Sequence, residues 1–134
     1  MGPMLVDTSV WINFFNGINN FQTKTVRECI ENDHPFFICP LIMQEILQGI
    51  RSDSEYSNVK ESLLKIEILT IDPLESAIGA ANLFRSLRKK GTTIKKSKDC
   101  LIAFYAIYFE INLLHNDKDF ELIAKYSDLK TQQS

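Results

Sequence analysis

The chain has 134 residues, of which 45% are hydrophobic and 24% are charged, with a formal net charge of −2. This is the size and composition of one soluble globular domain, and the overall charge does not indicate a nucleic-acid partner. Three cysteines without a C-x-x-C pair argue against a disulfide scaffold, and an apolar run of only ten residues from Cys100 argues against a membrane span, so we expect one cytoplasmic domain over residues 1–134.

The first predicted element is a very short buried strand over residues 3–6, followed by an apolar helix. Residues 1–3 hold Gly and Pro between two methionines, so we interpret them as a cloning remnant before a natural start at the second methionine. The helix has two candidate capping hydroxyls, Thr8 and Ser9. Asp7 is then left at the carboxyl end of the strand, free of a capping role.

A second helix is expected over about residues 20–32, and a second strand in the apolar segment PFFICP, residues 35–40. Pro40 favours the first turn of the next helix. Four apolar residues at helical spacing predict its buried face: Met43, Ile46, Leu47 and Ile50. This spacing turns Glu45 away from the core. The polar residues 52–58 are interpreted as a turn.

The second half of the chain begins with a helix to about residue 67 and a third strand candidate in IEILTI, residues 66–71. Asp72 and Pro73 then start a long helix as cap and first-turn residue, and Gly91 ends it. Six apolar positions at helical spacing support a continuous helix over this length: Leu74, Ala77, Ile78, Ala81, Phe84 and Leu87.

Asp99 begins a helix that is apolar almost all round through residue 109, so we expect it deep in the core or in a subunit interface. INLLH, residues 111–115, is the fourth strand candidate, a helix runs through Lys125, and DLK, residues 128–130, predicts a last edge strand. Strands that alternate with helices predict an α/β fold: a three-layer α/β/α domain with a central, mostly parallel sheet of four to five strands.

Two acidic residues follow predicted strands: Asp7 the first and Asp117 the fourth. Ligands bind at the carboxyl ends of strands in an open parallel sheet, so these carboxylates are expected at one crevice, with Asp99 and Glu45 near the same edge. Clustered carboxylates repel one another unless a cation or proton lies among them. Oxygen-only ligands select Mg²⁺ or Mn²⁺, ions that activate water for phosphoryl chemistry.

Taken singly, each acid also has a purely structural explanation. Asp7 and Asp99 fit as helix caps, either Asp117 or Asp119 fits as the cap of the last helix, and Glu45 fits as a surface residue. The shared place at strand ends is what favours a functional role for Asp7 and Asp117.

A basic strip lies between Arg85 and Lys98, where the chain has seven basic residues and no acidic residue. One interpretation is a solvated helix end, because basic side chains favour the negative pole of a helix. The other is a rim that faces phosphates, for which the lysines closest to Asp99 are the candidates: Lys95, Lys96 and Lys98.

Four segments together resemble the PIN domain, and specifically the VapC-type ribonuclease toxins of bacterial VapBC toxin-antitoxin pairs: LVDTSVWI, QEILQG, KKSKDCLIAFYAI and LLHNDKDFELIA. They extend over nearly the whole chain. The resemblance implies a metal-dependent endoribonuclease whose catalytic acids are Asp7, Glu45, Asp99 and Asp117. Asp7, Asp99 and Asp117 would hold Mg²⁺ or Mn²⁺, and Glu45 would complete the cluster or orient the attacking water.

The same resemblance implies supporting roles and partners. Ser9 matches a hydroxyl that orients metal-bound water or a neighbouring carboxylate, and Asp119 is interpreted as an outer ligand or a helix cap. A structured RNA such as tRNA or a ribosomal RNA loop is the implied substrate. A VapB-type antitoxin and a second copy of the chain, in a homodimer, are the implied protein partners.

This chain departs from the family pattern at two positions. Many relatives have a threonine where His115 stands, although LLHND resembles one branch of the toxins. Relatives often have an acid where Asn13 stands, and a missing fifth acid would weaken a second metal site more than the first.

Other functions fit the sequence less well than a nuclease does. A haloacid-dehalogenase-type phosphatase needs a second Asp where this chain has Ser9, and a two-component receiver domain needs an adjacent acid pair after the first strand. A thiol enzyme using Cys100 with His115 is a weaker rival. A non-catalytic PIN fold that binds RNA or protein would be marked by loss of acids, and all four are present.

Overall fold

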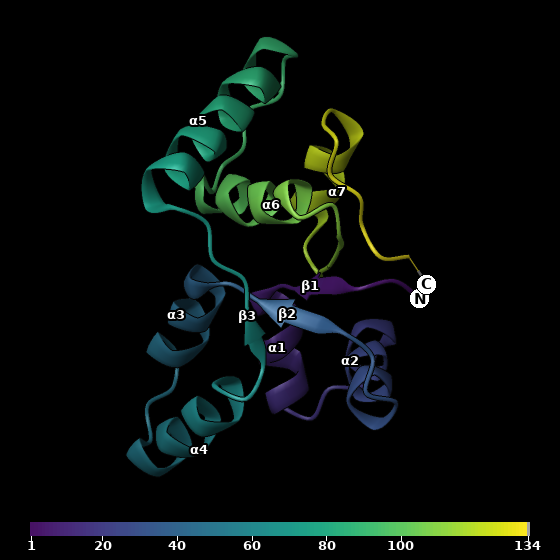
Figure 1. The fold of residues 1–134 in the computed structure, drawn as a ribbon, viewed down its shortest axis with the longest axis vertical. Helices are drawn as coiled ribbons and strands as arrows, with labels where there is room; N and C mark the ends of the chain where they lie inside the picture. Colours follow the sequence, from purple (N-terminus) through teal and green to yellow (C-terminus); the bar gives the residue numbers. More distant parts are fainter. Residues whose placement is uncertain (134) are drawn as a thin grey trace.

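The computed structural model describes residues 1–133, in which four short strands form one parallel sheet (Figure 1). The strands are β1 (Met4–Val6), β2 (Phe36–Ile38), β3 (Glu67–Ile68) and β4 (Asn112–Leu114), in the order β3-β2-β1-β4. Leu5 is in register with Phe37 on one side and Leu113 on the other. All three residues of β1 are fully buried, because neighbouring strands and helices enclose this strand.

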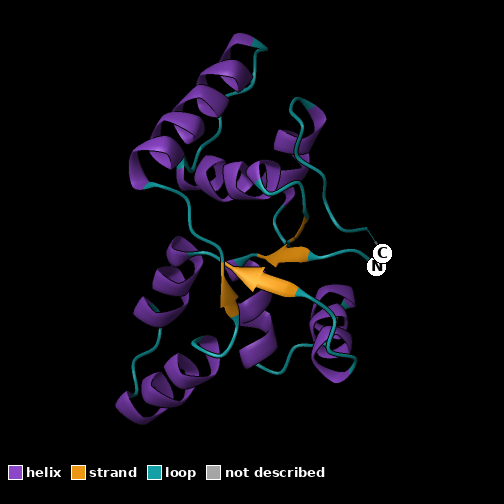
Figure 2. Cartoon of the chain, in the orientation of Figure 1, coloured by secondary structure: helices purple, strands orange, loops and turns teal. Residues whose placement is uncertain are grey.

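Seven helices in these residues cover the two faces of the sheet (Figures 1 and 2). The helices of one face are α1 (Thr8–Phe15), α2 (Phe21–Glu31), α3 (Pro40–Gln48) and α4 (Asp53–Leu63). Those of the other face are α5 (Pro73–Lys89), α6 (Lys98–Tyr108) and α7 (Lys118–Lys125). The predicted three-layer α/β/α fold with a parallel sheet is therefore confirmed.

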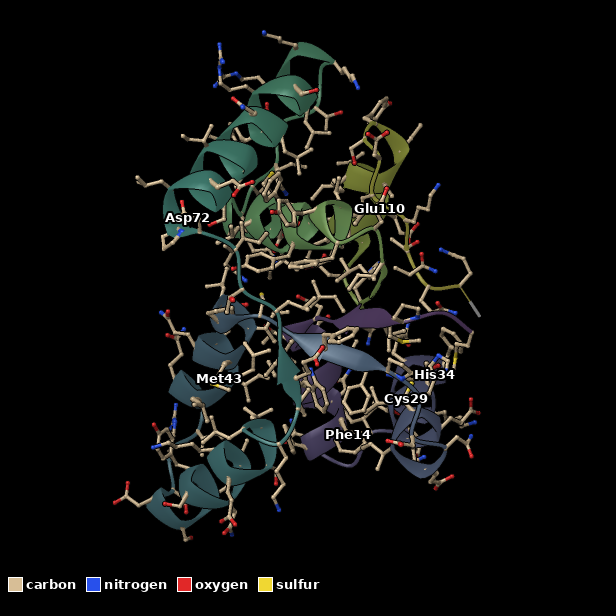
Figure 3. All side chains as sticks on the ribbon, in the orientation of Figure 1. Phe14, Cys29, His34, Met43, Asp72 and Glu110 are labelled. Atoms are coloured by element: carbon tan, nitrogen blue, oxygen red, sulfur yellow. The ribbon has the colours of Figure 1, made fainter. Side chains whose placement is uncertain are left out.

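The core lies in two layers, between the sheet and each set of helices. Phe14 of α1 and Cys29 of α2, both labelled in Figure 3, belong to the layer beneath the sheet. In the other layer, Ile102 and Ala106 of α6 are buried, as expected for a helix that is apolar almost all round. Within residues 1–133, no helix combines the length and apolar character that a membrane crossing requires.

The packed face of α5 is only partly apolar. Leu74 is 74% exposed and Ile78 is 62% exposed, whereas the polar Ser76 is buried and Gly79 packs against α6. A Cβ atom at Gly79 would lie 2.2 Å from the ring of Phe104, so this face is made of small residues that let a ring approach. The large apolar residues of α5 therefore do not share one face, because Leu87 is fully buried whereas Leu74 and Ile78 are exposed.

Two other predicted segments also differ. Residues 53–58 form the first turns of α4 and not a turn region, because the Ser52 side chain accepts a hydrogen bond from the Glu55 amide and caps the helix. That helix ends at Leu63, earlier than expected.

The predicted edge strand DLK does not form. Instead, the main chain makes an isolated parallel bridge between Leu113 and Thr131. The Leu113 amide donates to the Lys130 carbonyl at 2.9 Å, so this segment still lies beside β4 but pairs with it only briefly. The sheet thus has four strands, the lower end of the predicted range.

Candidate active site

Acidic side chains from several elements gather where β1 and β4 end. Asp7 directly follows β1, and its amide donates to the Leu114 carbonyl of β4 at 2.9 Å. Asp117 comes three residues after β4, Asp99 lies in the first turn of α6, and Glu45 lies within α3. The adjacent parallel strands therefore place Asp7 and Asp117 at one edge, as their positions in the sequence predict.

Asp7 itself caps α1, which corrects the prediction that Thr8 or Ser9 does so. The Asp7 backbone is extended, and its Oδ2 atom accepts hydrogen bonds from the Ser9 amide at 3.0 Å and the Ser9 hydroxyl at 2.6 Å. A cap is the last residue before helical geometry begins, and Thr8 is already helical. Burial raises the pKa of Asp7, against the effect of the hydrogen bonds from Ser9.

Two hydroxyls of α1 connect the acids. The Ser9 Oγ atom donates to Asp7 and accepts from the Asn116 amide at 3.0 Å, so it joins the ends of β1 and β4. The Thr8 Oγ1 atom donates to Glu45 Oε1 at 2.7 Å. Glu45 is half-buried and oriented by this contact, which contradicts the alternative that it is a plain surface residue. The cause is that α3 buries Ile42 and Ile46 most deeply, which brings Glu45 to the flank of its packed face.

Asp99 has a buried carboxylate oxygen that lacks a partner. Asp99 is 2% exposed, and its Oδ2 atom accepts no hydrogen bond from the described residues. Asp99 is not a helix cap, since Ser97 occupies the cap position of α6. Burial raises the pKa of Asp99 to about 6, although the positive charges of Lys96 and Lys98 act in the opposite direction.

Three carboxylates are close enough to hold one cation. Oxygen atoms of Asp99, Asp117 and Asp119 all lie within 4.8 Å of one another. Asp7 is outside this group, but its charge is among the causes that raise the pKa of Asp99. The unpartnered oxygen and the oxygen-only donor set fit a hard divalent ion such as Mg²⁺ or Mn²⁺.

Asp117 caps α7, so the interpretation of Asp119 as that cap is wrong. The Asp117 Oδ1 atom accepts from the Asp119 amide at 3.0 Å, and Asp119 lies in the first turn with its carboxylate facing the cluster. Burial opposes ionisation of Asp117, but hydrogen bonds from Lys96 and the Asp119 amide outweigh it, and the pKa of Asp117 is lowered.

The basic strip supplies cations to these acids. Lys96 Nζ lies 2.8 Å from Asp117 Oδ2 and 3.9 Å from Asp99 Oδ2. Lys98 forms an ion pair with Glu45 and lies 3.9 Å from Asp99 Oδ1. Lys95 is exposed and makes no ion pair with the described residues. Neither interpretation of the strip, a solvated helix end or a rim that faces phosphates, included these ion pairs with the acids.

His115 is a further residue whose contacts the sequence did not reveal. Its Nε2 atom lies 2.8 Å from Glu121 Oε1, and its Nδ1 atom accepts from the Asp117 amide at 3.1 Å. The hydrogen bond with His115 lowers the pKa of Glu121. Burial raises the pKa of Cys100 to about 11, which keeps its thiol protonated. A thiol enzyme would need His115 as a free base, and both of its ring nitrogens are engaged elsewhere.

The arrangement can be compared with known proteins. A family model described as "PIN domain" matches residues 4–126. This chain belongs to the PIN domain family. The matched span extends from the first residue of β1 to just beyond α7, so all of the acids described above lie within the PIN domain. The resemblance seen in the sequence is confirmed.

Curated relatives of this PIN domain carry ribonuclease names. The chain is similar to VapC ribonuclease Mb1587 of Mycobacterium bovis and to Ribonuclease VapC11 of Mycobacterium tuberculosis. Each is 29% identical over 128 residues, which cover 95% of this chain and 96% of the relative.

Solved structures share the fold at lower identity. VapBC2 from Rickettsia felis, bound to a promoter DNA fragment, matches with a TM-score of 0.75 and 18% identity over 97% of each chain. DNA-bound VapBC from Salmonella typhimurium matches with a TM-score of 0.75 and 19% identity over 98% of each chain. At this identity, the likeness establishes the fold of the PIN domain.

Proposed function

We propose that this PIN domain is a Mg²⁺- or Mn²⁺-dependent endoribonuclease that hydrolyses RNA phosphodiester bonds in the cytoplasm. The observation that carries the proposal is the buried Asp99 oxygen without a partner, beside the carboxylates of Asp117 and Asp119. An anionic group buried without compensation is costly, and a bound cation would remove that cost. The names of the VapC relatives support RNA as the substrate.

Asp99 and Asp117 would hold the ion together with Asp7, and Asp119 would contact it directly or through water. A bound divalent ion lowers the pKa of a water molecule and stabilises the leaving oxygen. Glu45, held by the Thr8 hydroxyl, would orient the attacking water. Ser9 fixes the direction of the Asp7 carboxylate, so the acids are pre-arranged before substrate arrives.

The lysines beside the acids would contact the RNA backbone. Lys95 is exposed at the start of the segment that leads into α6, where it can meet a phosphate. Lys96 and Lys98 carry their charges next to the carboxylates, where a phosphodiester would approach the ion. These contacts position RNA without reading its sequence.

The test is cleavage of total RNA, purified tRNA and ribosomal RNA by the purified protein with Mn²⁺ or Mg²⁺. Asp7→Asn is the preferred variant because asparagine caps a helix as well as aspartate does. We expect it to lower the cleavage rate by about 100-fold or more, since it removes a carboxylate from the metal site. Asp72→Asn is the matched control, because Asp72 caps α5 through a similar hydrogen bond outside the crevice.

The proposal fails if chelation leaves the cleavage products unchanged, or if Asp7→Asn cleaves like Asp72→Asn. RNA that binds without being cut would instead support the alternative, a non-catalytic PIN-fold module for RNA or protein binding. Mapping the cut ends on tRNA and ribosomal RNA identifies the substrate.

The proposal includes a VapB-type antitoxin as inhibitor, because the structural relatives are described as VapBC complexes. A pocket of about 470 Å³ between α1, α3 and α4 includes Ile12, Phe15 and Glu45 in its lining, so a bound segment would reach the crevice. Trp11 is buried and its Nε1 atom donates to the Val6 carbonyl, so it offers little surface to such a segment. In the same cleavage assay, an equimolar antitoxin from an adjacent reading frame would abolish cutting.

A homodimer is the last part of the proposal. Leu74 and Ile78 of α5 form an exposed apolar stripe with two small residues between and after them, Ala77 and Ala81. The hollow beside this stripe is lined mainly by apolar residues, including Leu41, Phe84 and Leu101. Such a face is suited to a second copy of the chain, because the large side chains of each copy can pack over the small residues of the other.

A further inference from the structure

His115 holds the main chain of an acid of the crevice. Its Nδ1 atom accepts the Asp117 amide hydrogen at 3.1 Å, and its Nε2 atom lies 2.8 Å from Glu121 Oε1. His115 is 9% exposed, and the centre of its ring lies 5.3 Å from that of the Phe120 ring. Two polar contacts and one packed face therefore fix the orientation of this ring.

These partners determine which ring nitrogen carries the proton. A backbone amide can only donate, so Nδ1 must present its lone pair to Asp117. The proton of the neutral ring is then on Nε2, where it is donated to the Glu121 carboxylate. Glu121, on α7, thus selects the tautomer that lets His115 accept from Asp117.

The hydrogen bond between Asp117 and His115 lies in the turn that follows β4, where backbone amides donate to side-chain atoms. The Asn116 amide donates to Ser9 Oγ, the Asp117 amide to His115 Nδ1 and the Asp119 amide to Asp117 Oδ1. Two of these three acceptors belong to the crevice acids or to the hydroxyl beside Asp7. The direction of the Asp117 carboxylate therefore depends on a main-chain conformation that His115 holds in place.

We propose that His115 is a positioning residue of the candidate metal site, whose Nδ1 atom fixes the Asp117 backbone while Glu121 fixes the ring tautomer. The inference rests on the proposed function, because Asp117 is one of the acids assigned to the ion. Outer contacts of this kind orient the groups that touch a metal, and their loss typically weakens metal affinity 10- to 100-fold.

Three variants separate the role of the Nδ1 acceptor from that of bulk. His115→Leu keeps a side chain of comparable size but replaces the polar ring with an apolar group, so the acceptor is lost. His115→Asn offers an amide oxygen at about the place of Nδ1 and keeps the acceptor. His34→Leu is the control, because His34 contacts the Gly2 carbonyl next to the chain start, at the opposite ends of the strands (Figure 3).

Mn²⁺ affinity is measured by electron paramagnetic resonance titration of the full chain, with a melting curve recorded for each variant. We expect His115→Leu to raise the Kd for Mn²⁺ by about 10-fold or more, and His115→Asn to stay within about 3-fold of wild type. His34→Leu should bind as wild type does. In metal-free protein, nitrogen NMR should show His115 protonated at Nε2, and the Asp117 amide resonance should move in the Leu variant and return in the Asn variant.

Unchanged Mn²⁺ affinity in His115→Leu would overturn the inference, as would an Asn variant that binds as weakly as the Leu variant. A proton found on Nδ1 would also overturn it. If wild type binds no Mn²⁺, the proposed function fails and the inference, which concerns that ion, fails with it. If wild type binds Mn²⁺ and only the His115 variants behave contrary to expectation, the proposed function stands and this inference alone is wrong.

Discussion

Asp99 is the residue at which burial and charge are most opposed. It is almost inaccessible, one of its oxygens has no hydrogen-bond partner, and burial raises its pKa to about 6 from an ordinary value of 3.8. Lys96 and Lys98 lie at 3.9 Å and compensate its charge only in part. Ionised Asp99 therefore lowers the free energy of unfolding when no cation is bound.

Because burial and charge are opposed at Asp99, the effect of Asp99→Asn on the free energy of unfolding of metal-free protein should depend on pH. Between about pH 4 and 6 the folded state binds more protons than the unfolded state, so the stabilising contribution of protonated Asp99 is complete below about pH 4 and is lost as the pH rises through about 6. The free energy of unfolding of Asp99→Asn, taken relative to that of wild type, should therefore rise by about 1 to 3 kcal/mol between pH 4 and pH 7.5.

Urea unfolding at both pH values, with a chelator present, measures this gain. Asp128→Asn is the control, because Asp128 is exposed and forms no ion pair with the described residues. An Asp99→Asn effect that is the same at both pH values would show that its charge is not destabilising. Added Mn²⁺ should stabilise wild type and not the variant.

At the scale of the elements, local signals in the sequence predicted which helices and strands form better than they predicted how these elements pack and are capped. Alternation of strands and helices was sufficient for the parallel sheet, and Asp72 with Pro73 correctly marked the start of α5. The close packing of α5 at Gly79 could not be predicted, because a glycine beside an aromatic ring carries no hydrophobic signal of its own. The cap of α1 was missed because Asp7 was assigned to chemistry alone, and one carboxylate serves both roles.

The close contact between α5 and α6 predicts that Gly79→Ala destabilises the protein. Alanine improves helix propensity by about 1 kcal/mol, but its methyl would overlap the Phe104 ring, and overpacking costs about 1 to 3 kcal/mol. We expect a net loss of about 1 kcal/mol in the free energy of unfolding.

Denaturant unfolding of Gly79→Ala is compared with Gly49→Ala, a position where a Cβ meets atoms no closer than 3.6 Å. Adding Phe104→Leu to Gly79→Ala should make the cost of the alanine smaller, because the ring is then gone. If Gly79→Ala is as stable as Gly49→Ala, the two helices do not pack as closely as described.

For the molecule as a whole, the sequence located the acids but not the way they are held. Their places at strand ends predicted a shared edge of the sheet, and the parallel pairing of β1 with β4 brings Asp7 and Asp117 to that edge. The contacts of Lys98 with Glu45 and of Thr8 with Glu45 join residues far apart in the chain. Such contacts follow from packing, so no local pattern could indicate them.

The exposed stripe on α5 gives a prediction for the assembly of the whole molecule. Ile78→Glu places a charge in the centre of that stripe, so it should convert the proposed dimer into a monomer with little change in folding. Light scattering during gel filtration, at several protein concentrations, measures the mass.

Ser57→Glu, at an exposed position of α4, is the control because it also adds one negative charge. A wild-type chain that is monomeric at all concentrations would remove the dimer from the proposal. A dimer that persists in Ile78→Glu would show that the two copies meet through another surface.

The direction in which the chain enters its helices has a consequence for the charge of the crevice. Asp7 and Asp117 stand at the N-termini of α1 and α7, and Asp99 lies in the first turn of α6. Each helix N-terminus carries about half a positive charge from its aligned peptide dipoles. Three of them bring to the carboxylates a positive potential that belongs to the backbone, so it would persist after every lysine nearby had been replaced.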